Sequence, residues 1–170
     1  YWQFGTDYKI DAKLDAATGR IIGHEVITIR NPSDSALRQL VIRLYQNRFD
    51  PMSVRLRTPP SVTNGQTLYR VVVDGTEIDT KQPAATWTTG TILVIPLVKP
   101  IPANGTSTVE IDWVGDIPDI PIGRGAARGG RRALRVFQLA QWYPQGSQYA
   151  DLRGWDRDPH RGGSEFYTNV

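Results

Sequence analysis

The sequence predicts an all-β domain, mostly antiparallel, folded as a saddle-like curved sheet or a sandwich. Apolar and polar residues alternate with a period of two in several segments, which is typical of strands with one buried face. Turn-forming Gly, Pro, Asn and Asp residues separate these segments at short spacing. No segment shows the apolar period of an amphipathic helix. The 170 residues are enough for about one domain.

Three strands are expected in the first part of the chain. Residues 7–14 alternate, and their apolar side carries Tyr8, Ile10, Ala12 and Leu14. A hairpin turn at 15–19 leads into a β-branched strand at 20–30, because Gly19 can adopt a positive φ. Asn31-Pro32 ends that strand, since proline cannot donate to the ladder. A third strand is expected at 37–46.

The middle of the chain continues the pattern after a long, irregular connection at 50–66. Four strands are predicted at residues 68–73, 76–80, 91–97 and 106–114. Turns such as Asp74-Gly75 and Asn104-Gly105 separate them. The regular spacing of short strands is what favours a sandwich or a large curved sheet.

Strand character returns late in the chain, at 135–143 and again at 164–170. The last segment alternates up to Val170, and an apolar strand left unpaired at a terminus is a hazard for aggregation. We therefore expect residues 1–170 to be a single β domain that is truncated at its C-terminal end.

The composition excludes several kinds of chemistry. There is no Cys, which excludes disulfides, thiolate zinc sites and cysteine nucleophiles, and there are only two His residues. No apolar run approaches the roughly 20 residues of a membrane helix, so no membrane span is expected. No signal peptide is evident, and the sequence is compatible with a secreted, periplasmic or cytoplasmic location.

The net charge of +3 is unevenly distributed, because much of the excess lies in a Gly- and Arg-rich stretch at 123–133. We expect this stretch to be a flexible, exposed loop within the domain. Gly-interleaved arginines also occur in some RNA-binding segments, but those usually carry aromatic residues, and none lies between Gly123 and Leu134. A solvated loop or a contact with another domain is therefore favoured, and no nucleic-acid partner is predicted.

Two short patterns raise the possibility of metal binding. His24-Glu25-Val26-Ile27-Thr28 resembles a zinc-protease motif but lacks the second His, and it lies on an expected strand, where positions i and i+4 are about 13 Å apart. Asp151, Asp156 and Asp158 could supply oxygen ligands for calcium, but their spacing matches no EF-hand loop. The simpler interpretation is that these aspartates pair with Arg153, Arg157 or backbone amides, so no metal site is predicted.

Aromatic residues are concentrated in the last third of the chain: Trp142, Tyr143, Tyr149, Trp155, Phe166 and Tyr167. Exposed aromatics on a β-sandwich would suit stacking against sugars. They would equally fill a core or a seam between domains. The residues alone thus leave open a free-standing carbohydrate- or protein-binding module.

Several segments resemble the N-terminal β domain of the M1 family of zinc metallopeptidases, the aminopeptidase family, most closely a bacterial branch. Residues 8–15 and 18–23 resemble the family's first hairpin, and residues 29–34 and 40–47 continue the likeness in order. Late in the chain the similar segments are Gln141-Trp142-Tyr143-Pro144, Gly154-Trp155-Asp156-Arg157-Asp158-Pro159 and Gly163-Ser164-Glu165-Phe166-Tyr167. The likeness is weak between about residues 50 and 105.

The resemblance implies a non-catalytic domain that packs on a thermolysin-like catalytic domain and helps to shape its peptide-binding site. The zinc ligands and catalytic residues of the family would lie in that missing domain, so no cofactor is expected in this chain. In the family, a Gln or Glu of the β domain helps to hold the substrate's free amino group. Gln141 best matches that position and Gln138 is the second candidate. The residues implied to face the catalytic domain are Trp142, Tyr143, Trp155, Phe166 and Tyr167.

Overall fold

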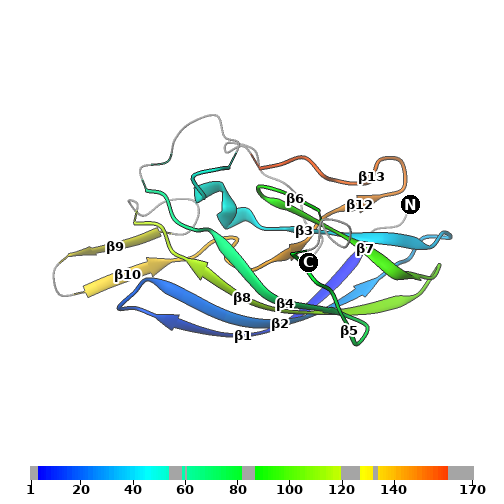
Figure 1. Cartoon of the computed structure of the whole chain (residues 1–170), viewed down its shortest axis with the longest axis horizontal. Helices are drawn as coiled ribbons and strands as arrows, with labels where there is room; N and C mark the ends of the chain where they lie inside the picture. The colour runs from blue at the N-terminus through cyan, green and yellow to red at the C-terminus, as the bar shows by residue number, and fades with distance from the viewer. Residues whose placement is uncertain are drawn as a thin grey trace.

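The computed structural model describes residues 4–53, 59, 61–81, 87–119, 127–131 and 134–160, with only the backbone described at 87–89, 127–131 and 134–135. Two antiparallel sheets pack face to face, and two short two-stranded ladders accompany them (Figure 1). The prediction of an all-β, mostly antiparallel fold is confirmed.

The larger sheet has the strand order β1-β2-β8-β4-β5. Its strands are β1 (Gly5–Asp15), β2 (Arg20–Arg30), β8 (Thr106–Asp116), β4 (Gln66–Val73) and β5 (Thr76–Glu77). β1 and β2 pair along their whole length, as the sequence predicted for this hairpin. Gly19, with φ +69°, closes the turn by donating its N–H to the Asp15 carbonyl at 2.9 Å.

The smaller sheet has the order β11-β3-β7-β6. Its strands are β11 (Gln145–Gly146), β3 (Leu37–Arg43), β7 (Ile92–Ile101) and β6 (Trp87–Thr89). The two ladders are formed by β9 (Ala127–Arg131) with β10 (Leu134–Gln138), and by β12 (Tyr149–Ala150) with β13 (Gly154–Trp155).

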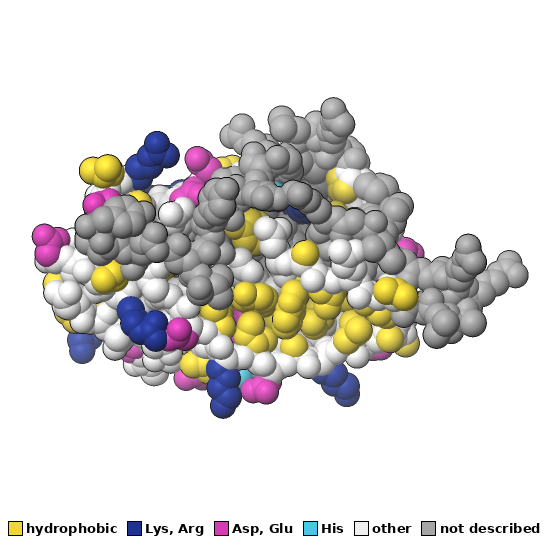
Figure 2. Space-filling view, turned by 180° about the vertical axis from the view of Figure 1, so that it is seen from behind, with side chains coloured by type: hydrophobic (Ala, Val, Ile, Leu, Met, Phe, Trp, Pro, Cys, Tyr) yellow, Lys and Arg dark blue, Asp and Glu magenta, His cyan; other side chains and the backbone are white. Residues whose placement is uncertain are grey.

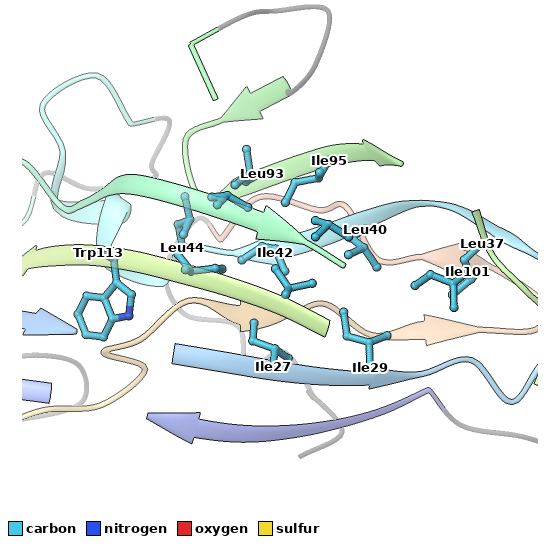
Figure 3. Packing of buried hydrophobic residues seen from close by; sticks show 14 of the residues in the cluster. Ile27, Ile29, Leu37, Leu40, Ile42, Leu44, Leu93, Ile95, Ile101 and Trp113 are labelled. Atoms are coloured by element: carbon cyan, nitrogen blue, oxygen red, sulfur yellow. The ribbon is translucent and has the colours of Figure 1, made fainter. Parts of the chain in front are cut away.

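The core lies between the two sheets, where alternate residues of each strand meet (Figure 3). The larger sheet contributes residues such as Ile27 and Ile29, and the smaller sheet contributes Leu40, Ile42 and Ile95. Each side chain of this size stabilises the fold by about 1.5–3 kcal/mol when it is fully buried. The period-two pattern of the sequence therefore positions the inner faces correctly.

The structure differs from the predicted strands where side-chain hydrogen bonds redirect the backbone. The third strand was predicted to reach residue 46 but ends at Arg43, and a 3₁₀ helix, η1 (Tyr45–Phe49), follows. The amide of Gln46 donates to backbone carbonyls of residues 140 and 141, and Asn47 Oδ1 accepts from the Gln66 N–H at 2.6 Å. These contacts draw residues 45–49 away from the extended path.

Two further expectations need correction. Part of the Gly- and Arg-rich stretch expected as a loop at 123–133 is β9, which pairs with β10 through backbone hydrogen bonds that its many glycines do not prevent. The strand predicted at 135–143 ends at Gln138, because Gln141 has φ +52°, which is incompatible with a strand. The strand expected at 164–170 lies outside the described residues.

The substitution Gly23→Ala is expected to destabilise the fold by about 1–3 kcal/mol. A Cβ atom at Gly23 on β2 would overlap the ring of Trp113, which is 1% exposed and fills the space above this glycine. The measurement is the free energy of unfolding in urea. The matched control is Gly5→Ala on β1, where the nearest atom would be Arg30 Nη1 at 3.6 Å, so a change within about 0.5 kcal/mol is expected. Equal effects would contradict the assigned packing.

Candidate functional site

The chain from the last residue of β10 to the residue after β11, here the 138–147 segment, covers part of the inner face of the larger sheet. The Trp142 ring lies 5.7 Å from that of Trp113 on β8, measured between centroids. The Tyr143 ring lies 5.3 Å from that of Tyr8 on β1. Trp142 and Tyr143 are thus both packed against residues of the larger sheet.

Hydrogen bonds from three other elements fix the backbone of the 138–147 segment. The Gln46 side-chain amide donates to the carbonyls of Ala140, at 2.8 Å, and Gln141, at 3.1 Å. The Gln66 amide donates to the Trp142 carbonyl at 2.9 Å. Tyr8 Oη accepts from the N–H of Gly146 at 2.8 Å. These partners lie on η1 and on β4 and β1 of the larger sheet, while β11 within the segment pairs with β3 of the smaller sheet, so the segment is tied to both sheets.

Gln141 occupies an uncommon backbone conformation at the centre of these contacts. Its φ of +52° lies in the left-handed region, which is unfavourable for a residue with a Cβ atom. Such conformations persist where the surroundings determine them, and they are frequent at functional sites. The side chain of Gln141 is half-buried, whereas Gln138 is exposed at the end of β10. The two candidates therefore have different surroundings.

A buried carboxyl group, Glu25 on β2, faces the inner side of the larger sheet. Glu25 is 0% exposed, and neither oxygen of its carboxyl group has a hydrogen-bond partner among the described residues. Burial raises its pKa to about 9, because the charged form loses its hydration. The Trp113 indole N–H offsets part of this effect, although the two groups do not reach hydrogen-bond geometry. Glu25 is therefore a neutral carboxylic acid at pH 7.

The titratable groups that face Glu25 are the phenols of Tyr8 and Tyr143. Burial raises the pKa of Tyr8 to about 12, and burial followed by the nearby Glu25 raises the pKa of Tyr143. Both phenols are thus neutral across the physiological range. The site offers amide groups, neutral hydroxyls and one protonated acid, which suit hydrogen bonding to a ligand or a neighbouring domain and not nucleophilic chemistry.

The other sequence-predicted residues are only partly assembled at this site. Trp142, Tyr143 and Trp155 are all half-buried and pack against the core, but Trp155 lies on β13, where its ring is 4.8 Å from that of Phe4. Phe166 and Tyr167 lie outside the described residues. The packing of the described aromatics gives no support to an exposed sugar-stacking platform.

The patterns considered for metals have other roles. His24 lies on β2, as the strand interpretation predicted, and its Nδ1 is 2.6 Å from Asp112 Oδ1. Asp156 pairs with Arg43, at 2.7 Å, and not with the neighbouring arginines, while its Oδ1 accepts from the Asp158 N–H. Within the described part of the chain, no group of three or more His, Cys, Asp or Glu side chains is arranged to hold a metal ion.

Sequence reasoning missed Glu25, Gln46 and Gln66. The signal for Glu25 was available: it occupies an inward position in the alternation of β2, between Ile21 and Ile27, where a charged residue is unusual. The two glutamines had no such signal, because their carbonyl partners lie more than 70 residues away along the chain.

No protein-family model matches the chain, and no curated protein matches it significantly. Among solved structures, it is similar to the M1 zinc metallopeptidase from Deinococcus radiodurans, with 11% identity and a TM-score of 0.46 over 73% of this chain and 24% of that one. A point mutant of this peptidase gives 12% identity and a TM-score of 0.47, over 74% and 24% of the two chains. A two-domain M1 zinc metallopeptidase mutant bound to L-tryptophan gives 10% identity and 0.45, over 73% and 23%.

The chain thus spans about a quarter of the length of these structures. At this level the similarity concerns the arrangement of strands and assigns no activity or ligand to the chain.

Among the described residues, no helix has the length and hydropathy needed to cross a membrane.

Proposed function

We propose that the chain is the non-catalytic N-terminal β domain of an M1-like zinc metallopeptidase, an aminopeptidase, and that it helps to shape the substrate site of a thermolysin-like catalytic domain. The zinc and the catalytic residues belong to that second domain. The support comes first from the sequence, in which segments at both ends resemble the family in the same order.

The observation that carries the proposal is the environment of Gln141. Amides from a different part of the fold hold the backbone at 140–142, and Gln141 itself keeps a left-handed conformation. A backbone that is already fixed does not have to be ordered when a ligand binds, which lowers the entropic cost of binding. The amide oxygen of Gln141 can accept a hydrogen bond from the free ammonium group of a peptide substrate.

Apolar surface on the same molecule also favours a neighbouring domain. Apolar side chains gather on one face of the molecule (Figure 2). The apolar row of β1 is buried less and less along the strand, from half-buried Tyr8 and Ile10 to exposed Ala12 and to Leu14, which is 39% exposed. Apolar patches on a soluble domain often mark an interface.

The decisive experiment is to read the coding sequence downstream of the codon for Val170. A His-Glu-x-x-His motif within the next couple of hundred codons, and one zinc ion per chain in the purified full-length protein, are expected. The 170-residue chain alone should neither retain stoichiometric zinc after dialysis nor cleave aminoacyl substrates. A downstream sequence without this motif would overturn the proposal.

The substitution Gln141→Ala in the full-length protein is expected to raise KM for an aminoacyl p-nitroanilide about tenfold or more, because a hydrogen bond to a charged group contributes about 1.5–3 kcal/mol. Gln138→Ala tests the second candidate in the same assay. Lys9→Ala, on the exposed side of β1, is the control and should leave KM unchanged. An unaltered KM for Gln141→Ala would remove the residue from the site.

A further inference from the structure

A shallow groove of about 520 Å³ lies between the start of β3 and the β12–β13 ladder. Its lining includes three arginines and two aromatic residues, namely Arg38, Arg153, Arg157, Tyr149 and Trp155. We call it the arginine groove. None of these residues belongs to the 138–147 segment, so the groove is separate from the candidate site described above.

The charges of the arginine groove are not neutralised within the described part of the chain. Arg38, Arg153 and Arg157 are exposed, and none of them forms an ion pair with a described carboxylate. No described Asp or Glu lines the groove. Asp156 and Asp158 line a neighbouring hollow that shares Arg153 and Arg157 with the groove, and Arg43 binds Asp156 there at 2.7 Å. Three cations therefore share one concave surface on which no described carboxylate lies within ion-pair distance of them.

The aromatic part of the arginine groove is held rigidly. Tyr149 and Trp155 are directly paired across the β12–β13 ladder, and their rings are 5.1 Å apart in an edge-to-face arrangement. Phe4 packs edge-to-face against Trp155 on another side, at 4.8 Å. Both rings remain half-buried, so part of each stays accessible. Ligand sites commonly combine an apolar or aromatic wall with a few charged groups.

The chemistry of the lining specifies an oxyanion. A guanidinium group is planar and donates two parallel hydrogen bonds to a phosphate or sulfate group. Three guanidinium groups around one groove offer more hydrogen-bond donors than a single carboxylate group can accept from. The volume is also within the range of small-molecule sites, about 300–1,000 Å³.

We propose that the arginine groove binds a small ligand that carries two or more phosphate or sulfate groups. The arginines engage the oxyanions, and the accessible parts of Trp155 and Tyr149 contact the remainder of the ligand. The proposal does not depend on the peptidase assignment, because it uses neither the 138–147 segment nor a second domain.

The test uses the 170-residue chain and isothermal titration calorimetry with inorganic tripolyphosphate and, separately, sucrose octasulfate. The groove variant combines Arg38→Gln, Arg153→Gln and Arg157→Gln. The matched control combines Lys9→Gln, Lys13→Gln and Lys99→Gln, which removes the same charge from exposed positions outside the groove. Circular dichroism checks that both variants fold.

At least one of the two probes is expected to bind the unmodified chain, and the probe that binds more tightly identifies phosphate or sulfate as the preferred group. Its affinity should fall tenfold or more in the groove variant and less than threefold in the control. No binding of either probe, or equal losses in the two variants, would overturn the proposal. Titration with a 12-residue oligothymidylate gives a further outcome that would overturn the proposal. If this oligonucleotide binds more tightly than both probes and loses affinity only in the groove variant, the groove is a nucleic-acid site.

Discussion

The substitution Glu25→Gln is expected to raise the free energy of unfolding by about 3 kcal/mol at pH 7. The buried carboxyl of Glu25 must stay protonated in the folded chain, whereas in the unfolded chain it ionises with its ordinary pKa of 4.5. Each pKa unit corresponds to about 1.4 kcal/mol. A glutamine has nearly the same shape as the protonated acid and carries no such proton requirement.

The direction of the pH dependence follows from the protons that each state binds. Below pH 4.5 the carboxyl is protonated in both states and contributes no pH dependence. Between pH 4.5 and about 9 the unfolded chain has lost the proton and the folded chain retains it, so stability falls as pH rises. The total loss across this window is up to about 6 kcal/mol, comparable to the whole stability of many domains. The phenols of Tyr8 and Tyr143 stay neutral here, because burial raises the pKa of both.

The measurement is urea unfolding at intervals between pH 5 and pH 9. The difference between the parent chain and Glu25→Gln should be small at pH 5 and grow steadily with pH. The control is Glu77→Gln, since Glu77 is exposed on β5 and its substitution should leave the profile of the parent unchanged. A parent profile that does not decline toward pH 9 would contradict the buried, proton-bound state of Glu25.

The location of Glu25 connects this prediction to the proposed function. Glu25 faces Tyr143, so its ionisation acts on the 138–147 segment that carries Gln141. The segment is tied down by hydrogen bonds and aromatic contacts that are individually modest. We therefore expect hydrogen exchange of the Gln141 and Trp142 amides to accelerate with pH more in the parent chain than in Glu25→Gln, after correction for the intrinsic rates.

The sequence predicts the sheets of this fold better than the connections between them. The alternation of β2 and the β-branched residues of β7 identify buried faces, because local periodicity reports burial directly. The path of the 138–147 segment depends instead on Gln46 and Gln66, which donate hydrogen bonds over long sequence distances. Local sequence contains no record of such pairings. The same reason explains why the first two residues of the 3₁₀ helix η1, Tyr45 and Gln46, were predicted as the end of a strand.

The aspartates near the end of the described chain show that ion-pair partners, too, are hard to predict from local sequence. Arg153, Arg157 or backbone amides were the expected partners of these aspartates, and Asp156 Oδ1 does accept from the Asp158 N–H. The ion-pair partner of Asp156, however, is Arg43, more than 100 residues earlier, which the sequence places in an ordinary alternating strand. An arginine that is 1% exposed requires nearly complete hydrogen bonding, and this requirement can be met only by segments that the fold brings together.

The substitution Arg43→Ala is expected to cost about 3–5 kcal/mol of folding free energy, the largest effect of a single truncation considered for this chain. Arg43 Nη2 binds Asp156 Oδ2 at 2.7 Å, and its Nε donates to Ser147 Oγ at 3.1 Å. Further donors reach the carbonyls of Asp156 and Asp158. Removing the guanidinium leaves these acceptors and a partly buried carboxylate without their main donor.

A double-mutant cycle separates the ion pair from the packing of the arginine stem. Arg43→Met keeps most of the apolar volume, and Asp156→Asn removes the opposite charge. If the pair is the dominant contact, the double variant should be more stable than the sum of the single effects predicts, by about 1 kcal/mol or more. Arg20→Ala is the exposed control, because Arg20 binds Asp116 at 2.8 Å with 54% of its side chain exposed, and it should cost at most about 1 kcal/mol.

The same cycle tests how Trp155 is held. Residues 147–158 contact β3 through Arg43 and through the Ser147 N–H, which donates to the Val41 carbonyl at 2.8 Å. With Arg43 replaced, the contacts that still hold this part of the chain among the described residues include the backbone hydrogen bonds, the hydrogen bond from Ser147 Oγ to the Asp156 carbonyl, and the packing of Trp155 against Phe4, Tyr149 and the core. The Trp155 indole signal in NMR spectra should therefore broaden or shift in Arg43→Met and not in Arg20→Ala. An unchanged signal, together with a loss below about 1 kcal/mol, would show that aromatic packing alone positions residues 147–158.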